Sequence, residues 1–506
     1  MKLSALLFPG EYTSAYHTEE IEITSICFTG EAVRQGSLFI CLCGTHYNTH
    51  ALLSTVAENG AAAALVEDGE EFVTPDGFPV FSVTSTRRAL SFAFDRFYRS
   101  PAKEMRLIGI TGTNGKTSTA TMIYTILCAA GYRTAIIGTV SCRTREKDYS
   151  AEIPEERRVM TTPDPDILYP MLSHMRDDGV EFVVMEVSSH ALALEKVAPL
   201  TFEVALFTNL SPEHLDFHMT MENYLDAKAR LFSQCKCGIL NFDDAFAEKI
   251  AARANCPILR CGAVYHEQFN AEEIRSQGAR GISYVFSSST LRMAVHLPIP
   301  GYFTVYNSLL ALCCTTYLGV APMVEKQALS DLHGIPGRME RLDMDPTLSN
   351  FSVFIDYAHT EAALRNLLLT VRGFRLNGER IVLVFGCGGD RDTGKRAPMG
   401  RIAEEYADFI IVTSDNSRTE EPSKIIRDIL LGMKNKEKRR VILRRGDAIT
   451  YAIRTAQEND IILLVGKGHE TYELREGKRY VFDEKRIVEE ALLQRKKEKE
   501  FHENLS

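Results

Sequence analysis

Short, mostly apolar runs alternate with amphipathic stretches from residue 105 to near the end of the chain. Such runs are typical of strands that are buried on both faces of a sheet. Because strands that are separated by helical stretches pair in parallel through crossover helices, the pattern predicts parallel α/β sheets. The predicted strands are Met105–Ile110, Thr134–Val140, Phe182–Val187, Val204–Thr208, Phe351–Ile355, Ile381–Phe385, Phe409–Thr413 and Ile461–Val465.

The clearest change from strand to helix follows Met105–Ile110. A glycine-rich stretch comes next, and apolar residues then recur at helical spacing from Lys116 onward. Gly131 is placed to end this helix, since glycine is favoured just beyond a helix C-terminus. The residues that define the apolar face are Met122, Ile123, Ile126, Leu127 and Ala130.

The chain divides at two points where the pattern breaks. Before the first break, at Tyr98–Pro101, the elements are short: a strand at Ser37–Leu42, a helix that starts in Ala51–Val56, and a strand at Ala61–Val66. The second break lies at His333–Gly337. We therefore expect three α/β domains, of residues 1–103, 104–335 and 336–506, with pockets at the carboxyl ends of the strands and between domains.

The composition excludes several classes of protein. Hydrophobic residues make up 45% and charged residues 25%, which is globular usage rather than that of a disordered or fibrous chain. The 58 basic and 67 acidic residues give a net charge of −9, which argues against nucleic acid as the main partner. A local basic pocket for an anionic substrate remains compatible with that charge.

The N-terminus and the cysteines indicate in which cellular compartment the protein is expected. The apolar stretch Leu3–Phe8 is too short for a signal peptide, and no run is long enough to span a membrane. We therefore expect a cytoplasmic protein, and a monomer. The twelve cysteines contain no CxxC pair, so we interpret them as reduced, buried thiols. Zinc binding at the close pairs Cys41/Cys43 and Cys235/Cys237 is the alternative.

A candidate phosphate loop joins the strand at Met105–Ile110 to the following helix. In Gly109-Ile-Thr-Gly-Thr-Asn-Gly-Lys-Thr117, glycines allow backbone N–H groups to converge on phosphate oxygens at the positive end of a helix. Lys116 can neutralise the outer phosphates, and the Thr117 hydroxyl can bind Mg²⁺. The usual spacing places glycine where Ile110 stands, so the loop is a variant. The bland alternative is a glycine-rich turn with a surface lysine. The predicted nucleotide contacts here are Gly112, Thr113, Asn114, Gly115, Lys116, Thr117 and Ser118.

Seven further motifs follow this loop in order. They are Thr161-Thr-Pro163, Met185-Glu-Val-Ser-Ser-His-Ala-Leu192, Thr208-Asn-Leu-Ser-Pro-Glu-His-Leu-Asp216, Pro336-Gly-Arg-Met-Glu340, Asp356-Tyr-Ala-His-Thr360, Gly386-Cys-Gly-Gly-Asp-Arg-Asp392 and Gly466-Lys-Gly-His-Glu470. Together with the loop, this set resembles the Mur ligases, the ATP-dependent amino-acid-adding enzymes of peptidoglycan synthesis. Within the family it is most similar to the enzymes that add the third amino acid. The resemblance implies a three-domain α/β architecture with a central P-loop parallel-sheet ATPase domain and a C-terminal Rossmann-like domain.

The resemblance also implies a reaction. ATP phosphorylates a substrate carboxylate, an amine attacks the acyl phosphate, and phosphate leaves, with Mg²⁺ screening the anions. Lys116, Glu186, His214 and Lys228 are the implied catalytic residues, and Mg²⁺ is implied at Thr117, Glu186, His214 and a carbamylated Lys228. Carbamylation would turn the lysine into an oxygen ligand, and it requires a neutral amine. Taken singly, Glu186 could be a helix-capping acid, His214 an ordinary loop histidine and Lys228 a solvated lysine.

Substrate contacts are implied position by position. Asn307, Arg338 and Asp356 resemble the adenine, phosphate and ribose contacts of ATP, although turn and cap roles would also suit Asn307 and Asp356. Lys196 stands where the family usually has arginine, so the charge remains but the bidentate fork is lost. The residues that resemble contacts to the UDP-MurNAc-dipeptide are Thr161, Thr162, Ser188 and Lys196.

The implied third amino acid is meso-diaminopimelate. Asp415-Asn-Ser-Arg418 resembles the Asp-Asn-Pro-Arg motif of enzymes that add it, and Arg418 would pair with its distal carboxylate. L-Lysine or ornithine is the alternative. The implied contacts to this amino acid are Arg391, Asp415, Asn416, Ser417, Arg418, Gly466 and Glu470.

The chain departs from the family pattern in its first domain. Thr29-Gly30-Glu31 stands where the family grips uridine with Asp-Ser-Arg, and Asn48-Thr49-His50 replaces Asp-Gly-His. Thr304 also replaces a usual asparagine. A folate or poly-glutamate ligase therefore remains an alternative, as does a P-loop regulatory nucleotide-binding protein of another class. Such a regulator would not need the second α/β domain. The TTP, EVSSHAL and GKGHE stretches favour a ligase of peptidoglycan synthesis over a folate or poly-glutamate ligase.

Overall fold

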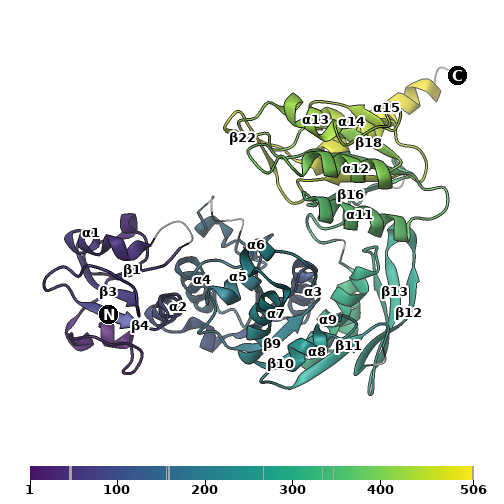
Figure 1. Ribbon diagram of the computed structural model, residues 1–506. Helices are drawn as coiled ribbons and strands as arrows, with labels where there is room; N and C mark the ends of the chain where they lie inside the picture. Colours follow the sequence, from purple (N-terminus) through teal and green to yellow (C-terminus); the bar gives the residue numbers. More distant parts are fainter. Residues whose placement is uncertain are drawn as a thin grey trace. The chain divides into compact units, whose positions relative to one another are not determined.

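The computed structural model describes residues 1–44, 48–154, 157, 160–265, 267–332, 334–345 and 347–503 (Figure 1). The chain forms two compact units. The first contains Met1–Phe269 and Leu310–Ala321, and the second contains Asn270–Leu309 and Pro322–Ser506. The side chains of the first unit's two sheets and those of the second unit's sheets form separate cores.

A four-stranded parallel sheet opens the first unit, in the order β1-β2-β3-β4. Leu53 and Val56 of α1 pack on one face, and Leu90 and Phe94 of α2 pack on the other. The elements are β1 Ser25–Cys27, β2 Ser37–Ile40, α1 Leu53–Glu58, β3 Ala61–Glu67, β4 Val80–Val83 and α2 Thr86–Phe97. The strands and the helix predicted before residue 67 are confirmed.

The second sheet of this unit contains the strands in the order β11-β10-β9-β5-β8-β6-β7, and all pair in parallel except β7. The strands are β5 Arg106–Thr111, β6 Thr134–Ile137, β7 Cys142–Arg143, β8 Phe182–Glu186, β9 Phe202–Phe207, β10 Cys235–Asn241 and β11 Ile258–Gly262. The helices are α3 Lys116–Ala129, α4 Pro165–Asp177, α5 Ser189–Ala193, α6 Leu215–His218, α7 Met221–Ala229 and α8 Ala247–Ala251.

One strand prediction in this sheet is too long. The run Thr134–Val140 was expected to be a single strand, but β6 ends at Ile137. The Gly138 N–H donates to the Ser141 carbonyl, and the chain turns back as the antiparallel strand β7. Hydropathy alone does not reveal this turn, because Val140 and Cys142 continue the apolar pattern of β6 beyond it.

The second unit begins with strands β12 Phe269–Ser276, β13 Ile282–Ser288 and β14 Arg292–Leu297. β13 and β14 pair antiparallel over six residue pairs, from Ile282↔Leu297 to Ser287↔Arg292. Two helices follow: α9 Phe303–Tyr317, whose residues are divided between the two units, and α10 Pro322–Ser330.

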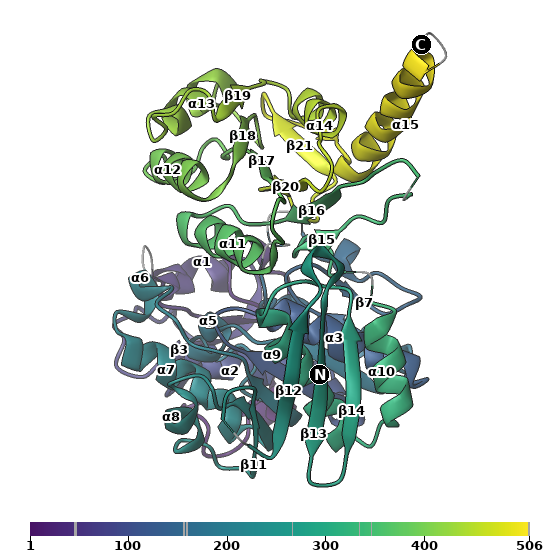
Figure 2. The same ribbon diagram turned by 90° about the vertical axis from the view of Figure 1, so that its right-hand side faces the viewer.

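The last sheet has the order β15-β16-β20-β17-β18-β19, and only β15 is antiparallel to its neighbour. Helices α12 and α13 lie on one face, whereas α14 and α15 lie on the other (Figure 2). The strands are β15 Glu340–Arg341, β16 Ser352–Asp356, β17 Ile381–Phe385, β18 Phe409–Val412, β19 Arg439–Val441 and β20 Ile461–Val465. β21 Tyr472–Arg475 and β22 Lys478–Val481 form a separate antiparallel pair. The helices are α11 Glu361–Phe374, α12 Arg396–Tyr406, α13 Pro422–Leu430, α14 Arg445–Arg454 and α15 Glu484–Glu503.

The sheet that contains β5 and the sheet that contains β16 carry the sequence motifs at the carboxyl ends of their strands. The phosphate loop follows β5, the EVSSHAL stretch spans the end of β8, and the TNL stretch follows β9. In the second unit, the motifs that contain Asp415 and Gly466 follow β18 and β20. Candidate chemistry therefore collects at one edge of each sheet. Of the helices in the described part of the chain, none has the length and hydropathy that a membrane span requires.

A buried ion pair between α14 and α15 should be important for the stability of the second unit. The Arg445 Nε donates to Glu484 Oε1 at 2.7 Å, and both side chains are almost fully buried. We expect Glu484→Gln to destabilise this unit by about 3–5 kcal/mol, because the guanidinium then lacks its counter-charge. Urea unfolding followed by circular dichroism measures the change.

Glu490→Gln on the same helix is the matched control. Glu490 pairs with Arg486, and both side chains are largely exposed. This control should leave the unfolding midpoint unchanged. Equal effects of the two substitutions would contradict the importance of the buried pair.

Candidate active site

The phosphate loop is shaped by glycines that no other residue could replace without strain. Gly112 has a φ of 147° and Gly115 a φ of 86°, both in the region that favours glycine. A Cβ at Gly112 would overlap the Thr208 hydroxyl. The loop therefore approaches the segment after β9 closely, with its backbone at the start of α3. This is the geometry in which backbone N–H groups and a helix N-terminus bind phosphate.

The segment after β9 holds the loop in place. Asn209 accepts the Thr113 N–H through its carbonyl at 2.8 Å and the Asn114 N–H through its side chain at 2.9 Å. The Thr208 hydroxyl donates to the Asn114 carbonyl at 2.6 Å. Thr208 and Asn209 belong to the TNL motif, but they were not predicted as site residues. The observation that could have identified them is the position of this motif directly after β9, the strand next to β5.

Lys116 and Thr117 point to different sides of the loop. The Lys116 ammonium donates to the carbonyls of Gly112 at 2.9 Å and Thr113 at 2.8 Å. The Thr117 hydroxyl donates to Glu186 Oε2 at 2.9 Å, and the Thr139 N–H donates to Glu186 Oε1 at 3.0 Å. Two of the four predicted metal ligands, Thr117 and Glu186, are thus in direct contact.

A cavity of about 320 Å³ opens beside the loop in the first unit. It brings together eight predicted residues: Gly112, Lys116, Thr161, Thr162, Ser188, Lys196, His214 and Lys228. Sequence reasoning missed five further lining residues: Met160, Ser189, His190, Leu194 and Tyr224. The cavity therefore combines hydroxyl donors with three lysines, a lining that suits an anionic ligand.

Lys228 is the most unusual of these residues. Its side chain is buried on α7, with a relative exposure of 1%, and its ammonium lies 4.4 Å from the Tyr224 ring centre. Burial, and secondarily the charge of Lys116, hold the pKa of Lys228 well below its ordinary value. The interpretation of this residue as a solvated helical lysine is therefore wrong.

Three histidines line or flank the same cavity. The rings of His190 and His214 meet edge to face with centroids 4.8 Å apart, and His214 has a positive φ of 56°. His218 is buried and bonds to the Ser189 hydroxyl at 2.9 Å. Burial and the nearby His190 and Lys228 lower the pKa of His218 to about 4, so it is neutral at pH 7. His190 was not predicted, although it lies inside the EVSSHAL motif.

Lys196 lies in a network of charges. Its ammonium pairs with Asp164 Oδ1 at 2.6 Å, and Arg157 donates to both Asp164 and Asp166. Burial alone would raise the pKa of Asp164, but Lys196 and Arg157 lower it overall. Thr162 donates to the Glu186 carbonyl at 2.9 Å and accepts the Ser188 N–H at 3.0 Å. These contacts fix the predicted hydroxyl donors relative to β8.

The predicted amino-acid site forms a second cluster, in the second unit. Asp415, Asn416 and Ser417 are all buried, and the Asn416 amide donates to Glu470 at 2.7 Å. Burial, with Asp415 nearby, raises the pKa of Glu470. A Cβ at Gly466 would overlap the Asp415 carboxylate, so glycine is required there.

Arg418 lies at the rim of this cluster. It has a φ of 51°, and its guanidinium donates to the Gly389 carbonyl at 2.7 Å. Both Arg418 and the exposed Arg391 lie beside Gly388. The structure thus brings together two cations and two carboxylates, which is a suitable environment for a zwitterionic ligand.

The three remaining predicted nucleotide contacts also belong to the second unit. The Asp356 carboxylate accepts the Met339 and Ala358 N–H groups at 2.8 Å each, and burial raises its pKa. The Arg338 guanidinium lies over the Tyr357 ring, 5.5 Å from its centre. Asn307 is buried on α9. Arg338 and Asp356 are therefore neighbours.

Cys43, His50 and Glu70 lie close enough to one another to hold a metal ion. Their hydrogen bonds are nevertheless satisfied within the chain. The Glu67 N–H donates to His50 Nε2 at 3.0 Å, which leaves the proton on Nδ1, where Asn48 accepts it at 2.5 Å. The lone pair that a metal would need at Nδ1 is therefore occupied. All twelve cysteines are free thiols, and most are buried, as predicted.

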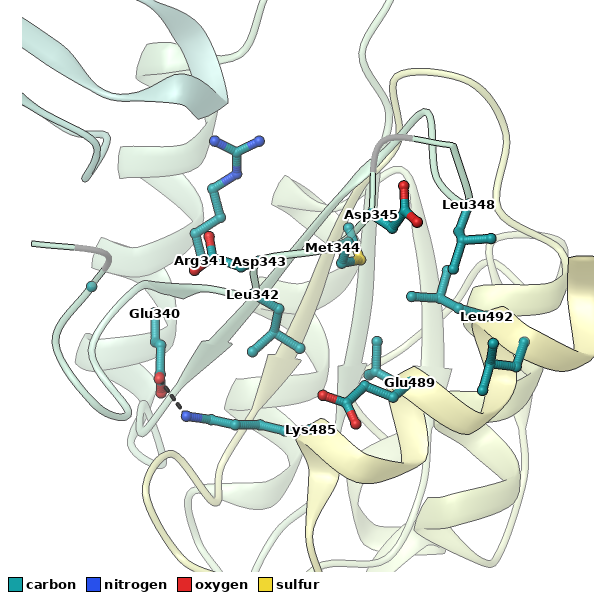
Figure 3. A pocket seen from close by; sticks show the side chains of 13 residues that line it. Glu340, Arg341, Leu342, Asp343, Met344, Asp345, Leu348, Lys485, Glu489 and Leu492 are labelled. Carbon is teal, nitrogen blue, oxygen red and sulfur yellow. Dashed lines mark hydrogen bonds and ion pairs between the residues drawn. The ribbon is translucent and has the colours of Figure 1, made fainter. Parts of the chain in front are cut away.

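A larger cavity of about 550 Å³ lies between the segment after β15 and helix α15 (Figure 3). Leu342, Leu348 and Leu492 line it, and the Glu340–Lys485 ion pair at 2.5 Å bounds one end. None of the predicted site residues lines it. Its mixed apolar and charged walls show no set of groups suited to phosphoryl or acyl transfer.

Comparison with known proteins agrees with this geometry. Residues 110–315 match the Mur ligase middle domain, and residues 337–468 match the Mur ligase, glutamate ligase domain. The UDP-N-acetylmuramoyl-L-alanyl-D-glutamate–2,6-diaminopimelate ligase of Syntrophomonas wolfei is 38% identical over 480 residues, covering 93% of this chain and 95% of that protein. The ligase of the same name from Geobacillus kaustophilus is 38% identical over 507 residues, with 98% and 100% covered.

A solved structure of a UDP-N-acetylmuramoyl-L-alanyl-D-glutamate–2,6-diaminopimelate ligase is also similar. It has a TM-score of 0.70 and 28% identity, and the match covers 97% of this chain and 98% of that one. The two domain models and the full-length relatives identify the chain as an enzyme of the ligase class. The chain belongs to the Mur ligase family.

The lowered pKa of Lys228 leads to a prediction about stability. The folded-state pKa lies below the unfolded value of 10.5, so the unfolded chain binds more protons and burial of this lysine is destabilising below pH 10.5. In bicarbonate-free buffer we expect Lys228→Met to raise the melting temperature at pH 7. The gain should shrink as the pH approaches 10.5. Calorimetric melting across this pH range measures it.

Lys236→Met is the control, because Lys236 is exposed at 64% of its side chain. We expect no comparable gain from this substitution. A lower melting temperature for Lys228→Met at pH 7 would show that the buried ammonium is stabilised by its surroundings.

Proposed function

We propose that the protein is an ATP-dependent, ADP-forming ligase that joins meso-diaminopimelate to the D-glutamyl carboxylate of UDP-N-acetylmuramoyl-L-alanyl-D-glutamate. The observation that carries the proposal is the cavity in which the phosphate loop, hydroxyl donors and three lysines meet. The full-length similarity to 2,6-diaminopimelate ligases supports the choice of substrates. L-Lysine or ornithine remains the alternative amino acid.

We divide the chain into three functional domains, of residues 1–103, 104–335 and 336–506. The separate four-stranded sheet, the sheet that carries the phosphate loop, and the sheet that carries Asp415 support this division. The reaction takes small-molecule substrates, and we place it in the cytoplasm and assign it to a monomer.

ATP would bind with its phosphates on residues 112–118. Lys116, now bonded to loop carbonyls, would turn to the outer phosphates when they bind, because an anion is a stronger partner for an ammonium than a carbonyl. Asn307, Arg338 and Asp356 are the proposed contacts to adenine, phosphate and ribose. Thr117 and Ser118 lie in the first turn of α3, where the helix dipole favours negative charge.

Four residues that line the cavity or lie next to the phosphate loop fit Mg²⁺. The Thr117 hydroxyl and the Glu186 carboxylate are in contact and offer the oxygen donors that this hard cation prefers. His214 and a carbamylated Lys228 complete the proposed ligand set. Bound there, Mg²⁺ would neutralise charge on the reacting phosphate.

Lys228 has the property that carbamylation requires. Its neutral amine attacks CO₂, an N–C bond forms and one proton leaves, so that the neutral amine becomes an anionic carbamate. The pKa well below the ordinary lysine value makes the neutral amine available. The negative charge of the carbamate would be favourable beside the Lys116 ammonium.

The acceptor dipeptide would enter the cavity with its carboxylate facing the loop. Thr161, Thr162 and Ser188 offer hydroxyls, and Lys196 offers a cation that would exchange Asp164 for the substrate. A carboxylate oxygen attacks the γ-phosphorus and ADP leaves. The amine then attacks the acyl carbon, loses a proton, and phosphate departs from the tetrahedral intermediate.

The amino-acid cluster suits a substrate with a second amino-acid head group. Arg418 and Arg391 offer cations for its carboxylate, and Glu470 offers an anion for its ammonium. Asp415, Asn416, Ser417 and Gly466 would shape the pocket around that group. A P-loop regulatory protein would have no use for this second cluster, and the ligase interpretation is therefore favoured.

The phosphate-loop assignment predicts the effect of Lys116→Ala. We expect a loss of about 3–4 kcal/mol of transition-state stabilisation, or ~10²–10³ in turnover, because the lysine neutralises charge that develops during phosphoryl transfer. ADP release in the presence of both substrates and Mg²⁺ measures this loss. Lys103→Ala, at an exposed position, is the control. Near-normal turnover of Lys116→Ala would contradict the assignment of this loop as the nucleotide site.

Selectivity for the amino acid tests the substrate assignment. ADP release should be faster with meso-diaminopimelate than with L-lysine by at least ~10² in kcat/KM, because L-lysine leaves the arginines unpaired. Arg418→Ala should remove most of this margin, while the exposed Arg427→Ala should not. Equal use of L-lysine and meso-diaminopimelate by the wild type would overturn the role of Arg418 but not the ligase class.

A further inference from the structure

Beneath the amino-acid cluster lies a fully buried lysine that has no role in the function proposed above. The Lys467 side chain has no exposed surface, and its ammonium donates to Asn416 Oδ1 at 2.9 Å and to the Tyr472 carbonyl at 2.6 Å. The carboxylates of Asp415 and Glu470 lie 3.8 and 3.7 Å from the same nitrogen. Two segments of the second unit, residues 415–416 and 467–472, therefore meet at one ammonium group.

The backbone around Lys467 is built to direct its side chain inward. The flanking Gly466 and Gly468 have φ values of 120° and 55°. A Cβ at Gly466 would overlap the Asp415 carboxylate, and one at Gly468 would lie 2.6 Å from the Tyr357 Cβ. Gly466 thus allows the loop after β20 to approach the loop after β18, and Gly468 allows it to approach the segment after β16.

The contacts of Lys467 determine which way the Asn416 amide faces. Asn416 Oδ1 accepts both from Lys467 and from the Leu474 N–H at 2.9 Å, so its Nδ2 must face Glu470. Reversed, the amide would place its NH₂ group against two donors. The ammonium therefore sets the amide, and the amide holds the Glu470 carboxylate at 2.7 Å.

We propose that Lys467 is a positioning residue for amino-acid selectivity, which orients Asn416 and keeps Glu470 ionised so that Glu470 can bind the ammonium of the incoming diamino acid. The inference rests on the proposed function for the identity of that ligand. Lys467 itself is covered by the cluster and need not touch the substrate. Its effect on the substrate passes through Asn416 and Glu470.

The charges around Glu470 give this proposal a pH signature. Burial raises the pKa of Glu470, and Lys467 is the first of the groups that lower it. The titratable groups that face Glu470 are Lys467, Asp415, Arg418, Tyr357 and Tyr472. Without Lys467 the pKa of Glu470 rises further, so a higher pH is needed to ionise it.

The test uses the full-length protein with Lys467→Met, Lys467→Arg and the control Lys485→Met. Lys485 lies in the same unit and pairs with Glu340. For Lys467→Met we expect KM for meso-diaminopimelate to rise at least ~30-fold, with KM for ATP and for the dipeptide unchanged within about twofold. The acid limb of kcat/KM for the amino acid should move to higher pH. Lys467→Arg, which retains the charge, should keep the limb near its wild-type position, and Lys485→Met should change none of these values.

A merely structural lysine would give a different result. Loss of folded protein would lower the rate with all substrates equally and would leave the acid limb of kcat/KM for the amino acid at its wild-type pH. That outcome would overturn the proposal. A crystal structure of Lys467→Met decides the positioning step without any assay: unchanged Asn416 and Glu470 side chains would also overturn it. A wild type that is inactive with every diamino acid would defeat the proposed function, while the crystal structure would still test the positioning.

Discussion

The carboxyl ends of β5, β8 and β9 lie next to one another, and the candidate chemistry of the first unit depends on this adjacency. The loop after β5 can curl around phosphate only because Thr208 and Asn209, after β9, hold its backbone. Glu186, at the end of β8, meets Thr117 for the same reason. Parallel pairing thus converts three segments that are distant in sequence into one site, without any special local structure beyond two glycines.

Charge is distributed differently in the two candidate clusters. The cavity beside the phosphate loop contains three lysines, of which Lys228 is buried and carries a lowered pKa. It is suited to reacting anions that repel one another. The cluster in the second unit sets Arg418 and Lys467 against Asp415 and Glu470, which suits a ligand with both charges. A ligase that activates a carboxylate in one place and selects an amine in another needs this division.

Most buried strands could be predicted from hydropathy, because strands that are covered on both faces leave long apolar runs. The turn at Gly138 could not, since Val140 and Cys142 continue the apolar pattern of β6 beyond the turn, which is closed by a backbone hydrogen bond. Lys116 and Glu186 could be predicted because their motifs lie at the ends of buried strands and resemble those of the Mur ligases. The burial of Lys228, the cavity position of His190 and the role of Lys467 depend on packing between distant segments, which no local pattern encodes.

The central claim is that the protein activates a carboxylate by phosphorylation before the amine attacks. It can be tested with UDP-N-acetylmuramoyl-L-alanyl-D-glutamate that carries ¹⁸O in the D-glutamyl side-chain carboxylate, together with ATP and meso-diaminopimelate. Because the oxygen that attacks the γ-phosphorus leaves with the phosphate, mass spectrometry of the released phosphate should find one ¹⁸O atom per turnover. Product formation with no ¹⁸O in the phosphate would contradict the account.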